Sequence, residues 1–194
     1  MSNKFIPALV AGVAAACLVG GAASAQMTSP MGKENTVMVG GAAMYPSRNI
    51  VQNAVNSKDH TILVTAVQAA GLVDTLSSPG PFTVFAPTNA AFAKLPAGTV
   101  ESLLQPANVG MLRTVLTYHV VPGSYDAATI IGAIKAGGGK ATLKTVQGEE
   151  ITASIEGGKV VVTDKRGGKA TVTAADLRQS NGIIHVTDAV SLPG

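Results

Sequence analysis

The spacing of apolar residues changes near Lys140, and this change limits the folds open to the chain. Before Lys140, apolar residues recur three or four positions apart, which is typical of helices. After it, they alternate with Thr, Ser and Lys, which predicts strands with one face on a core. Helices first and strands later, without regular alternation, predict an α+β domain with an antiparallel sheet or sandwich rather than a doubly wound parallel sheet.

Five helical stretches are expected before the change. Their apolar stripes are Ile50, Val51, Ala54 and Val55; Leu63, Ala66, Val67 and Ala70; Val100, Leu103 and Leu104; Val109, Leu112, Val115 and Leu116; and Ala127, Ile130, Ile131 and Ile134. Ser57 or Asp59 is placed to cap the second stretch, and Gly71 to end it. His60, in the first turn of that stretch, is expected to face solvent.

The tripeptide Gly-Gly-Lys occurs at 138–140, 157–159 and 167–169, each time before a predicted strand. A glycine pair followed by lysine suggests a phosphate-binding loop. The full motif is absent, because no Gly-Lys is followed by Ser or Thr at the required distance from an earlier glycine. Hairpin turns explain all three better, since paired glycines supply the positive φ angles that tight turns need.

The N-terminal region predicts export. Residues 1–25 combine Lys4 near the start, an apolar stretch and the small-residue tripeptide Ala23-Ser24-Ala25, which is the layout of a secretory signal peptide cut before Gln26. A lipoprotein reading of Cys17 fits less well, because Ala14 stands where a larger aliphatic residue is expected. Residues 26–45 lack periodicity and are interpreted as a flexible leader, and 46–194 as one domain. The product is expected in the periplasm or outside the cell, with no transmembrane segment after cleavage.

Composition excludes several classes of protein. Cys17 is the only cysteine, so the mature chain has no disulfide, no thiolate nucleophile and no thiolate metal site. The formal net charge is +3, the lysines are scattered and aromatic residues are few. That pattern excludes a nucleic-acid-binding surface. A domain of about 150 residues can be held together by its core alone, and a monomer is expected.

Three stretches stand out together. The first is "GPFTVFAPTNAAFAKLP" at 80–96, where a strand through Phe85 stops at Pro87, and Thr88 or Asn89 caps a short helix that turns Phe92 inward. The second is "LTYHVVPGSY" at 116–125, a helix end leading into a short strand. The third is "SNGIIHVTDAVSLP" at 180–193, where Asn181-Gly182 is predicted to make a tight turn into a final strand that contains His185.

In this order and spacing, the three stretches resemble the fasciclin I domain family over about residues 46–193. The chain is similar to single-domain bacterial members such as the small secreted fasciclin-type antigens of mycobacteria. The resemblance implies a β-sandwich or wedge of antiparallel strands with helices packed across it. It also implies a non-catalytic role in adhesion, with a cell-surface or matrix protein or polysaccharide as partner and no cofactor.

The resemblance also suggests contact residues. In animal members, adhesion has been tied to an Asp-Ile pair ahead of the Asn-Gly turn, which corresponds here to Asp176 and Leu177. The family's Tyr-His block, also implicated in adhesion, corresponds to Tyr118 and His119. A structural alternative holds for Asp176, because an aspartate before a turn often accepts hydrogen bonds from nearby backbone N–H groups.

His119 and His185 lie in apolar runs and are expected to serve the fold. A neutral imidazole offers one donor and one acceptor, so each can connect a strand to a neighbouring carbonyl or N–H. Zinc would need both to converge with carboxylates such as Asp188, and no metal-binding spacing is present. No serine nucleophile motif or nucleophile–base pair is visible, so an enzyme is not expected. The sequence leaves open a pair of acids for glycoside hydrolysis, because two such acids come together only in the fold.

A second function is open. Some algal members of the family bind carotenoids, and helices packed across a sheet can enclose an apolar groove. The alternative to adhesion is therefore an extracytoplasmic carrier of an apolar small molecule such as a carotenoid.

Overall fold

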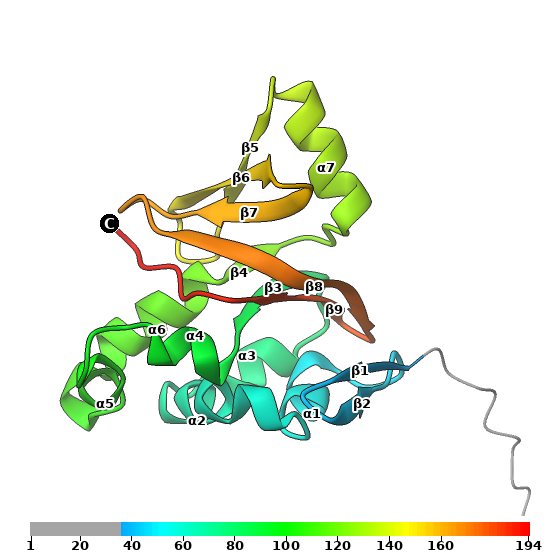
Figure 1. Cartoon of the computed structure of the whole chain (residues 1–194). Coiled ribbons are helices and arrows are strands. Elements are labelled where there is room, and N and C mark those ends of the chain that lie inside the picture. The colour runs from blue at the N-terminus through cyan, green and yellow to red at the C-terminus, as the bar shows by residue number, and fades with distance from the viewer. Residues whose placement is uncertain (1–35) are drawn as a thin grey trace, which may run out of the picture. The chain divides into compact units, whose positions relative to one another are not determined.

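The computed structural model describes residues 36–194, so the predicted signal peptide (1–25) and residues 26–35 of the predicted leader lie outside the described residues. The helices are α1 (Ile50–Ala54), η1 (Lys58–His60), α2 (Thr61–Ala69), α3 (Val73–Ser77), α4 (Asn89–Ala93), α5 (Thr99–Leu103), η2 (Pro106–Asn108), α6 (Val109–Tyr118) and α7 (Ala127–Ala136). The strands are β1 (Val37–Val39), β2 (Ala42–Met44), β3 (Phe82–Pro87), β4 (Val120–Pro122), β5 (Lys140–Lys144), β6 (Glu150–Glu156), β7 (Lys159–Thr163), β8 (Lys169–Gln179) and β9 (Gly182–Thr187). The α+β prediction is confirmed (Figure 1).

The main sheet of the described chain has seven strands in the order β4-β3-β9-β8-β7-β6-β5. Every neighbouring pair is antiparallel except β3 and β9, which run parallel from Phe82 opposite Gly182 to Pro87 opposite Thr187. The expectation of a purely antiparallel sheet is therefore wrong at this pair. The two edge strands approach each other, since Val146, just after β5, donates its N–H to the carbonyl of Val120 in β4 at 2.8 Å. The sheet is thus mixed and nearly closed.

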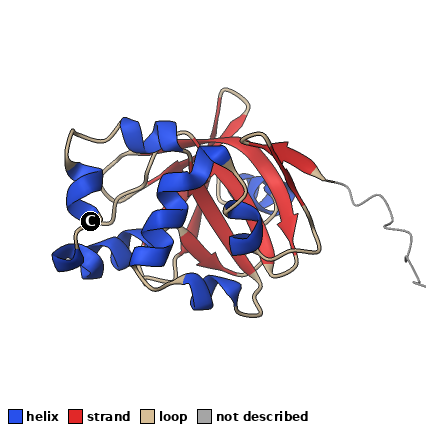
Figure 2. Cartoon of the chain, turned by 90° about the horizontal axis from the view of Figure 1, so that it is seen from below, coloured by secondary structure: helices blue, strands red, loops and turns tan. Residues whose placement is uncertain are grey.

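Two apolar cores lie on the two faces of this sheet. The larger packs α1, α2, α3 and α6 against β3 and β9, and includes Leu63, Leu116 and Ile184. The smaller packs α7 against the inner face of β5–β7, with Ile130 and Ile134 at its centre. Figure 2 shows the helices lying across the strands, and Figure 1 shows α7 beside β5 and β6. Alternation along β5 and β6 agrees with their buried residues, Ala141, Leu143, Ile151 and Ala153, which lie in the smaller core.

The N-terminal hairpin corrects the predicted leader. β1 and β2 pair from Val37 opposite Met44, and Val39 and Met44 are buried in the larger core. Residues 37–44 therefore belong to the folded domain, which begins before Pro46. Strands of three residues are too short to show a period of two, so the sequence pattern gave no sign of them.

The three Gly-Gly-Lys tripeptides have different roles. Gly157-Gly158 joins β6 and β7, with φ angles of +57° and +78°, and Gly167-Gly168 lies in the longer turn between β7 and β8. These two hairpin predictions are confirmed. The third is wrong, because Gly138-Gly139 joins α7 to β5. Positive φ is needed after a helix C-terminus as well as in a hairpin, so the glycine pair alone does not separate the two.

The turn before β9 differs in detail from the prediction. Gln179 pairs with Gly182, so the two loop residues are Ser180 and Asn181, and Gly182 already belongs to β9. Gly182 has no positive φ. A Cβ at this position would instead collide with the carbonyl oxygen of Phe82 in the parallel strand β3. Close approach of two backbones therefore requires this glycine.

Candidate functional site

Asp176 lies at an irregular point of β8. The register between β8 and β9 shifts between Ala174 and Leu177, and Asp176 has a φ of +60°. Among the described residues it is the only non-glycine with a positive φ. Aspartate tolerates this left-handed conformation better than most residues because its short side chain bonds locally. The bulge leaves the Asp176 side chain exposed to solvent.

The Asp176 carboxylate is hydrogen-bonded to the N-terminus of α7. Its Oδ1 accepts a hydrogen bond from the backbone N–H of Ala127 at 2.7 Å. Asp126, the N-cap of the same helix, accepts from the Thr129 N–H at 2.8 Å and forms an ion pair with Arg178 at 3.1 Å. Hydrogen bonds from Thr129 and the nearby Arg178 lower the pKa of Asp126. Two carboxylates therefore lie where the helix dipole favours negative charge.

His185 supports this arrangement from inside. Its Nδ1 accepts from the backbone N–H of Asp176 at 3.4 Å, and its Nε2 donates to the carbonyl oxygen of Tyr125 at 2.8 Å. The ring stacks on Phe85, with centroids 5.6 Å apart. Burial lowers the pKa of His185, so the neutral ring with its proton on Nε2 fits both bonds. Asp176 is thus held through both its backbone and its side chain.

His119 and Tyr118 connect α6 to the C-terminal half. His119 donates from Nδ1 to the Val115 carbonyl at 2.8 Å and accepts at Nε2 from the Ser191 N–H at 3.0 Å. The Tyr118 hydroxyl donates to the Glu150 carbonyl and accepts from the Lys165 N–H, each at 3.2 Å. Burial lowers the pKa of His119 and raises that of Tyr118. Every polar atom of these two side chains is paired.

Residues of the stretch 80–96, the first of the three that resemble the family, hold α4 in place. Thr88 is the N-cap, and its side chain accepts from the Ala91 N–H at 3.2 Å. Asn89 accepts from the Ile62 N–H at 3.1 Å and donates to the Lys58 carbonyl at 2.9 Å, which connects α4 to the start of α2. Pro87 ends β3, and Phe92 is buried in the larger core.

Only one of the four residues suggested as partner contacts is exposed. Asp176 lies on the surface, whereas Leu177 is 1% exposed, Tyr118 0% and His119 4%. Leu177 and His119 line the same internal cavity, and Tyr118 lies in the smaller core. A surface contact at this site can therefore involve the Asp176 side chain without rearrangement, and the other three only after one.

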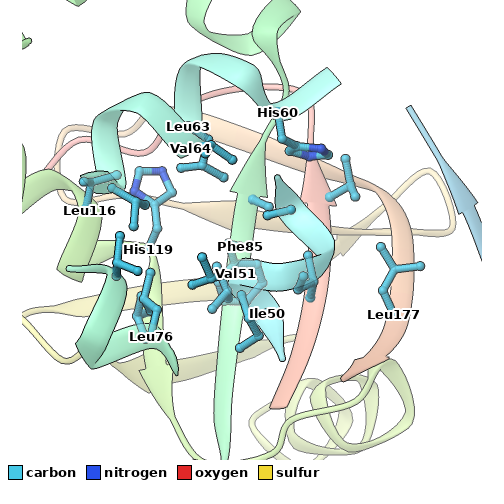
Figure 3. Close-up of a pocket in the computed structure, with 18 of the residues that line it drawn as sticks. Ile50, Val51, His60, Leu63, Val64, Leu76, Phe85, Leu116, His119 and Leu177 are labelled. Carbon is cyan, nitrogen blue, oxygen red and sulfur yellow. The ribbon is translucent and has the colours of Figure 1, made fainter. Parts of the chain in front are cut away.

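An apolar cavity of about 50 Å³ lies between the helices and the sheet. It is lined by side chains from α1, α2, α3 and α6 and from β3 and β9, and His60 and His119 lie on different sides of it (Figure 3). Apart from these two histidines and Gln68, its lining is apolar. The site can hold a small apolar group.

His60 is buried, so the expectation that it faces solvent is wrong. It is 3% exposed and lies in the one-turn helix η1, which is not in phase with the α-helical stripe that follows. Its Nδ1 lies 2.8 Å from the Ser57 hydroxyl, and its Nε2 has no hydrogen-bond partner among the described residues. Burial lowers the pKa of His60, which nearby Asp59 and the Ala86 carbonyl partly offset.

The side-chain bonds of two buried asparagines were not predicted from the sequence. Asn53 accepts from the Tyr45 N–H at 3.0 Å and donates to the Tyr45 carbonyl and to the Gln179 side chain. Asn181 was expected only as a turn residue, but its side chain bonds three backbone groups in other segments. An amide within an apolar stripe, as at Asn53, was the available signal. The N-cap role of Asp126 was also missed, although an aspartate directly before a helical stripe indicates one.

Within residues 36–194, no three His, Cys, Asp or Glu side chains come together as metal ligands. The same residues contain no helix with the length and apolar character needed to cross a membrane.

Comparison with known proteins agrees with this architecture. The family described as "Fasciclin domain" matches residues 58–193. Protein sll1483 of Synechocystis is 48% identical over 160 residues, covering 82% of this chain and 82% of that protein. The immunogenic protein MPB70 of Mycobacterium bovis is 37% identical over 145 residues, covering 72% of this chain and 66% of that one.

A solved structure shares the fold. The domain pair of the insect cell adhesion molecule fasciclin I superimposes with a TM-score of 0.66 at 19% identity, covering 75% of this chain and 51% of that one. The family match spans most of the chain, and its boundaries enclose β3, β9 and the Asp176 bulge between them. The chain belongs to the fasciclin domain family.

Proposed function

We propose that this protein is an exported, non-catalytic adhesion module that binds a cell-surface or matrix component through the exposed carboxylate of Asp176. The observation that carries the proposal is the bulge in β8, which holds this carboxylate at the surface in one fixed position. A strained backbone conformation persists only where the surroundings maintain it, and such positions are common at binding sites. The insect protein with the same fold is named a cell adhesion molecule, which agrees with this function.

Export rests on the N-terminal sequence. Residues 1–25 have the layout of a secretory signal, and we propose that the chain acts in the periplasm or outside the cell after cleavage near Ala25-Gln26.

Replacing Asp176 by Asn tests the contact. Asn retains a carbonyl oxygen for the Ala127 N–H and tolerates a positive φ, but removes the charge. We expect Asp176→Asn to fold normally and to bind at least about tenfold more weakly, the loss expected for one charge-assisted hydrogen bond. The measurement is a binding isotherm of the purified chain on producing cells and on matrix-coated surfaces.

Asp74→Asn is the matched control, because Asp74 is also an exposed aspartate and lies on a different element, α3. Its binding should equal that of the parent chain. Saturable binding that Asp176→Asn leaves unchanged would move the contact elsewhere on the surface. The absence of saturable binding by the parent chain would refute the adhesion proposal.

The apolar cavity favours a second candidate function, the carriage of a small apolar molecule. At about 50 Å³ the cavity accepts a compact group, and a longer molecule such as a carotenoid requires the helices to separate from the sheet. A carrier purified from its native source should retain a bound molecule, visible as absorbance in the carotenoid range or as added mass under native conditions. A colourless chain with no added mass would contradict this candidate.

A further inference from the structure

A groove of about 400 Å³ with a partly polar lining lies beside the β8–β9 hairpin. It shares no lining residue with the apolar cavity described above. Its walls come from segments far apart in the sequence, namely Pro79–Pro81, Ser124 and Arg178–Ile183. The volume falls within the range of small-molecule sites.

Among residues 36–194, Arg178 is the one charged side chain that lines the groove. Its side chain is 65% exposed, and the ion pair with Asp126 uses one guanidinium nitrogen, Nη2, at 3.1 Å. A guanidinium has five N–H donors, so several are left for a ligand. Asp126 does not line the groove, and Thr129 and Arg178 already bind its carboxylate.

The remaining polar groups of the groove divide into two kinds. The amide side chains of Gln179 and Asn181 are committed to the protein, to Leu177 and Asn53 in one case and to Ile50, Leu76 and Ser78 in the other. The hydroxyls of Ser124 and Ser180 form no hydrogen bond with any residue of the described chain. The groove therefore offers a ligand the guanidinium group of Arg178 and the hydroxyl groups of Ser124 and Ser180.

We propose that this groove binds a uronic acid unit of an acidic polysaccharide. Arg178 would bind the carboxylate, since planar guanidinium and carboxylate groups fit one another closely. The two serine hydroxyls would exchange hydrogen bonds with the sugar hydroxyls. The groove is larger than a single acidic side chain needs, and no Asp or Glu of the described part of the chain lines it to repel an anion. This inference is independent of the proposed contact at Asp176.

Titration of polygalacturonate into the purified chain at low ionic strength tests the groove. We expect saturable binding that weakens as salt is added, with no binding of uncharged dextran. Arg178→Gln should weaken binding by about 10- to 100-fold, the range for a hydrogen bond to a charged group. Arg166→Gln is the matched control, because Arg166 is an exposed arginine whose side chain has one hydrogen-bond partner among the described residues, the Pro193 carbonyl. Its affinity should match that of the parent chain.

A second variant keeps Arg178 in place. Ser180→Asp puts a carboxylate into the groove from an exposed turn position and should also weaken binding at least tenfold. Asp176→Asn should retain the affinity for polygalacturonate, so loss of adhesion at Asp176 and loss of sugar binding in the groove are measured separately. The proposal is overturned if the parent chain does not bind polygalacturonate, or if Arg178→Gln binds as tightly as the parent. Equal affinity for polyglutamate would overturn the assignment of a sugar.

Discussion

The free energy of unfolding should fall steeply as the pH is lowered from 7 to 5. His60, His119 and His185 are all buried, and burial lowers the pKa of each. In the unfolded chain they titrate near 6.5, so below this pH the unfolded state binds more protons than the folded state. The contribution of the three neutral histidines to the free energy of unfolding is therefore fully present above about pH 6.5. It is lost as the pH falls towards their lowered pKa values in the folded state. Over the pH range in which a histidine is protonated in the unfolded chain but neutral in the folded one, it lowers the free energy of unfolding by about 1.4 kcal/mol for each pH unit.

Urea unfolding at intervals between pH 5 and 8 measures this dependence. His60→Gln is an informative variant, because the only hydrogen bond of the His60 ring to a described residue is that of Nδ1 with the Ser57 hydroxyl. In this variant, the free energy of unfolding should depend less steeply on pH, because only His119 and His185 still contribute to the slope. A flat profile between pH 5 and 7 would show that the three histidines do not govern acid stability. Losses confined to pH below 4 would instead point to carboxylates such as Asp126, whose pKa is also lowered.

Asn181→Ala should destabilise the fold by about 3 kcal/mol, because several buried polar groups lose their partners. The Asn181 Oδ1 accepts from the Ile50 N–H at 3.0 Å, and its Nδ2 donates to the carbonyls of Leu76 and Ser78 at 2.8 and 3.0 Å. One amide thereby connects the β8–β9 hairpin to the start of α1 and the end of α3. Alanine provides none of these bonds, so the Ile50 N–H and the carbonyls of Leu76 and Ser78 lose their partner.

Chemical denaturation of the parent chain and the variant gives the difference directly. Asn56→Ala is the control, since Asn56 is exposed and its side chain makes one bond, to the Gln52 carbonyl at 2.8 Å. It should change stability by less than about 0.5 kcal/mol. If Asn181→Ala unfolds at the same denaturant concentration as Asn56→Ala, the three bonds do not contribute to net stability.

Local patterns in the sequence predicted local structure well. The apolar stripes correctly located α2, α6 and α7, and alternation located β5 to β8, because the repeat of a helix or strand determines which of its side chains share a face. The same reasoning failed at His60, where a one-turn 3₁₀ helix shifts the phase of the stripe. It also failed at β1 and β2, which are too short to show a repeat.

The candidate sites depended much less on local patterns. The sequence singled out Asp176, but only the fold brings the Ala127 N–H, 49 residues away, to its carboxylate. The groove at Arg178 likewise joins residues near 80, 124 and 180 that no spacing rule connects. Residues far apart in the sequence come together only through the pairing of distant strands. The apolar residues of β3 and β9 would be the same beside any other strand, so their pattern does not reveal that these two strands are parallel neighbours.

The sequence by itself therefore determined the α+β class, the helical and strand segments with their buried faces, and the family. The tertiary structure alone decided that β3 lies parallel to β9, that His60 is buried, and that the Asp176 carboxylate meets the Ala127 N–H. The physical reason is that periodicity reports the face that a segment turns to its core. The contacts between segments arise from packing across the whole chain, which no single segment encodes.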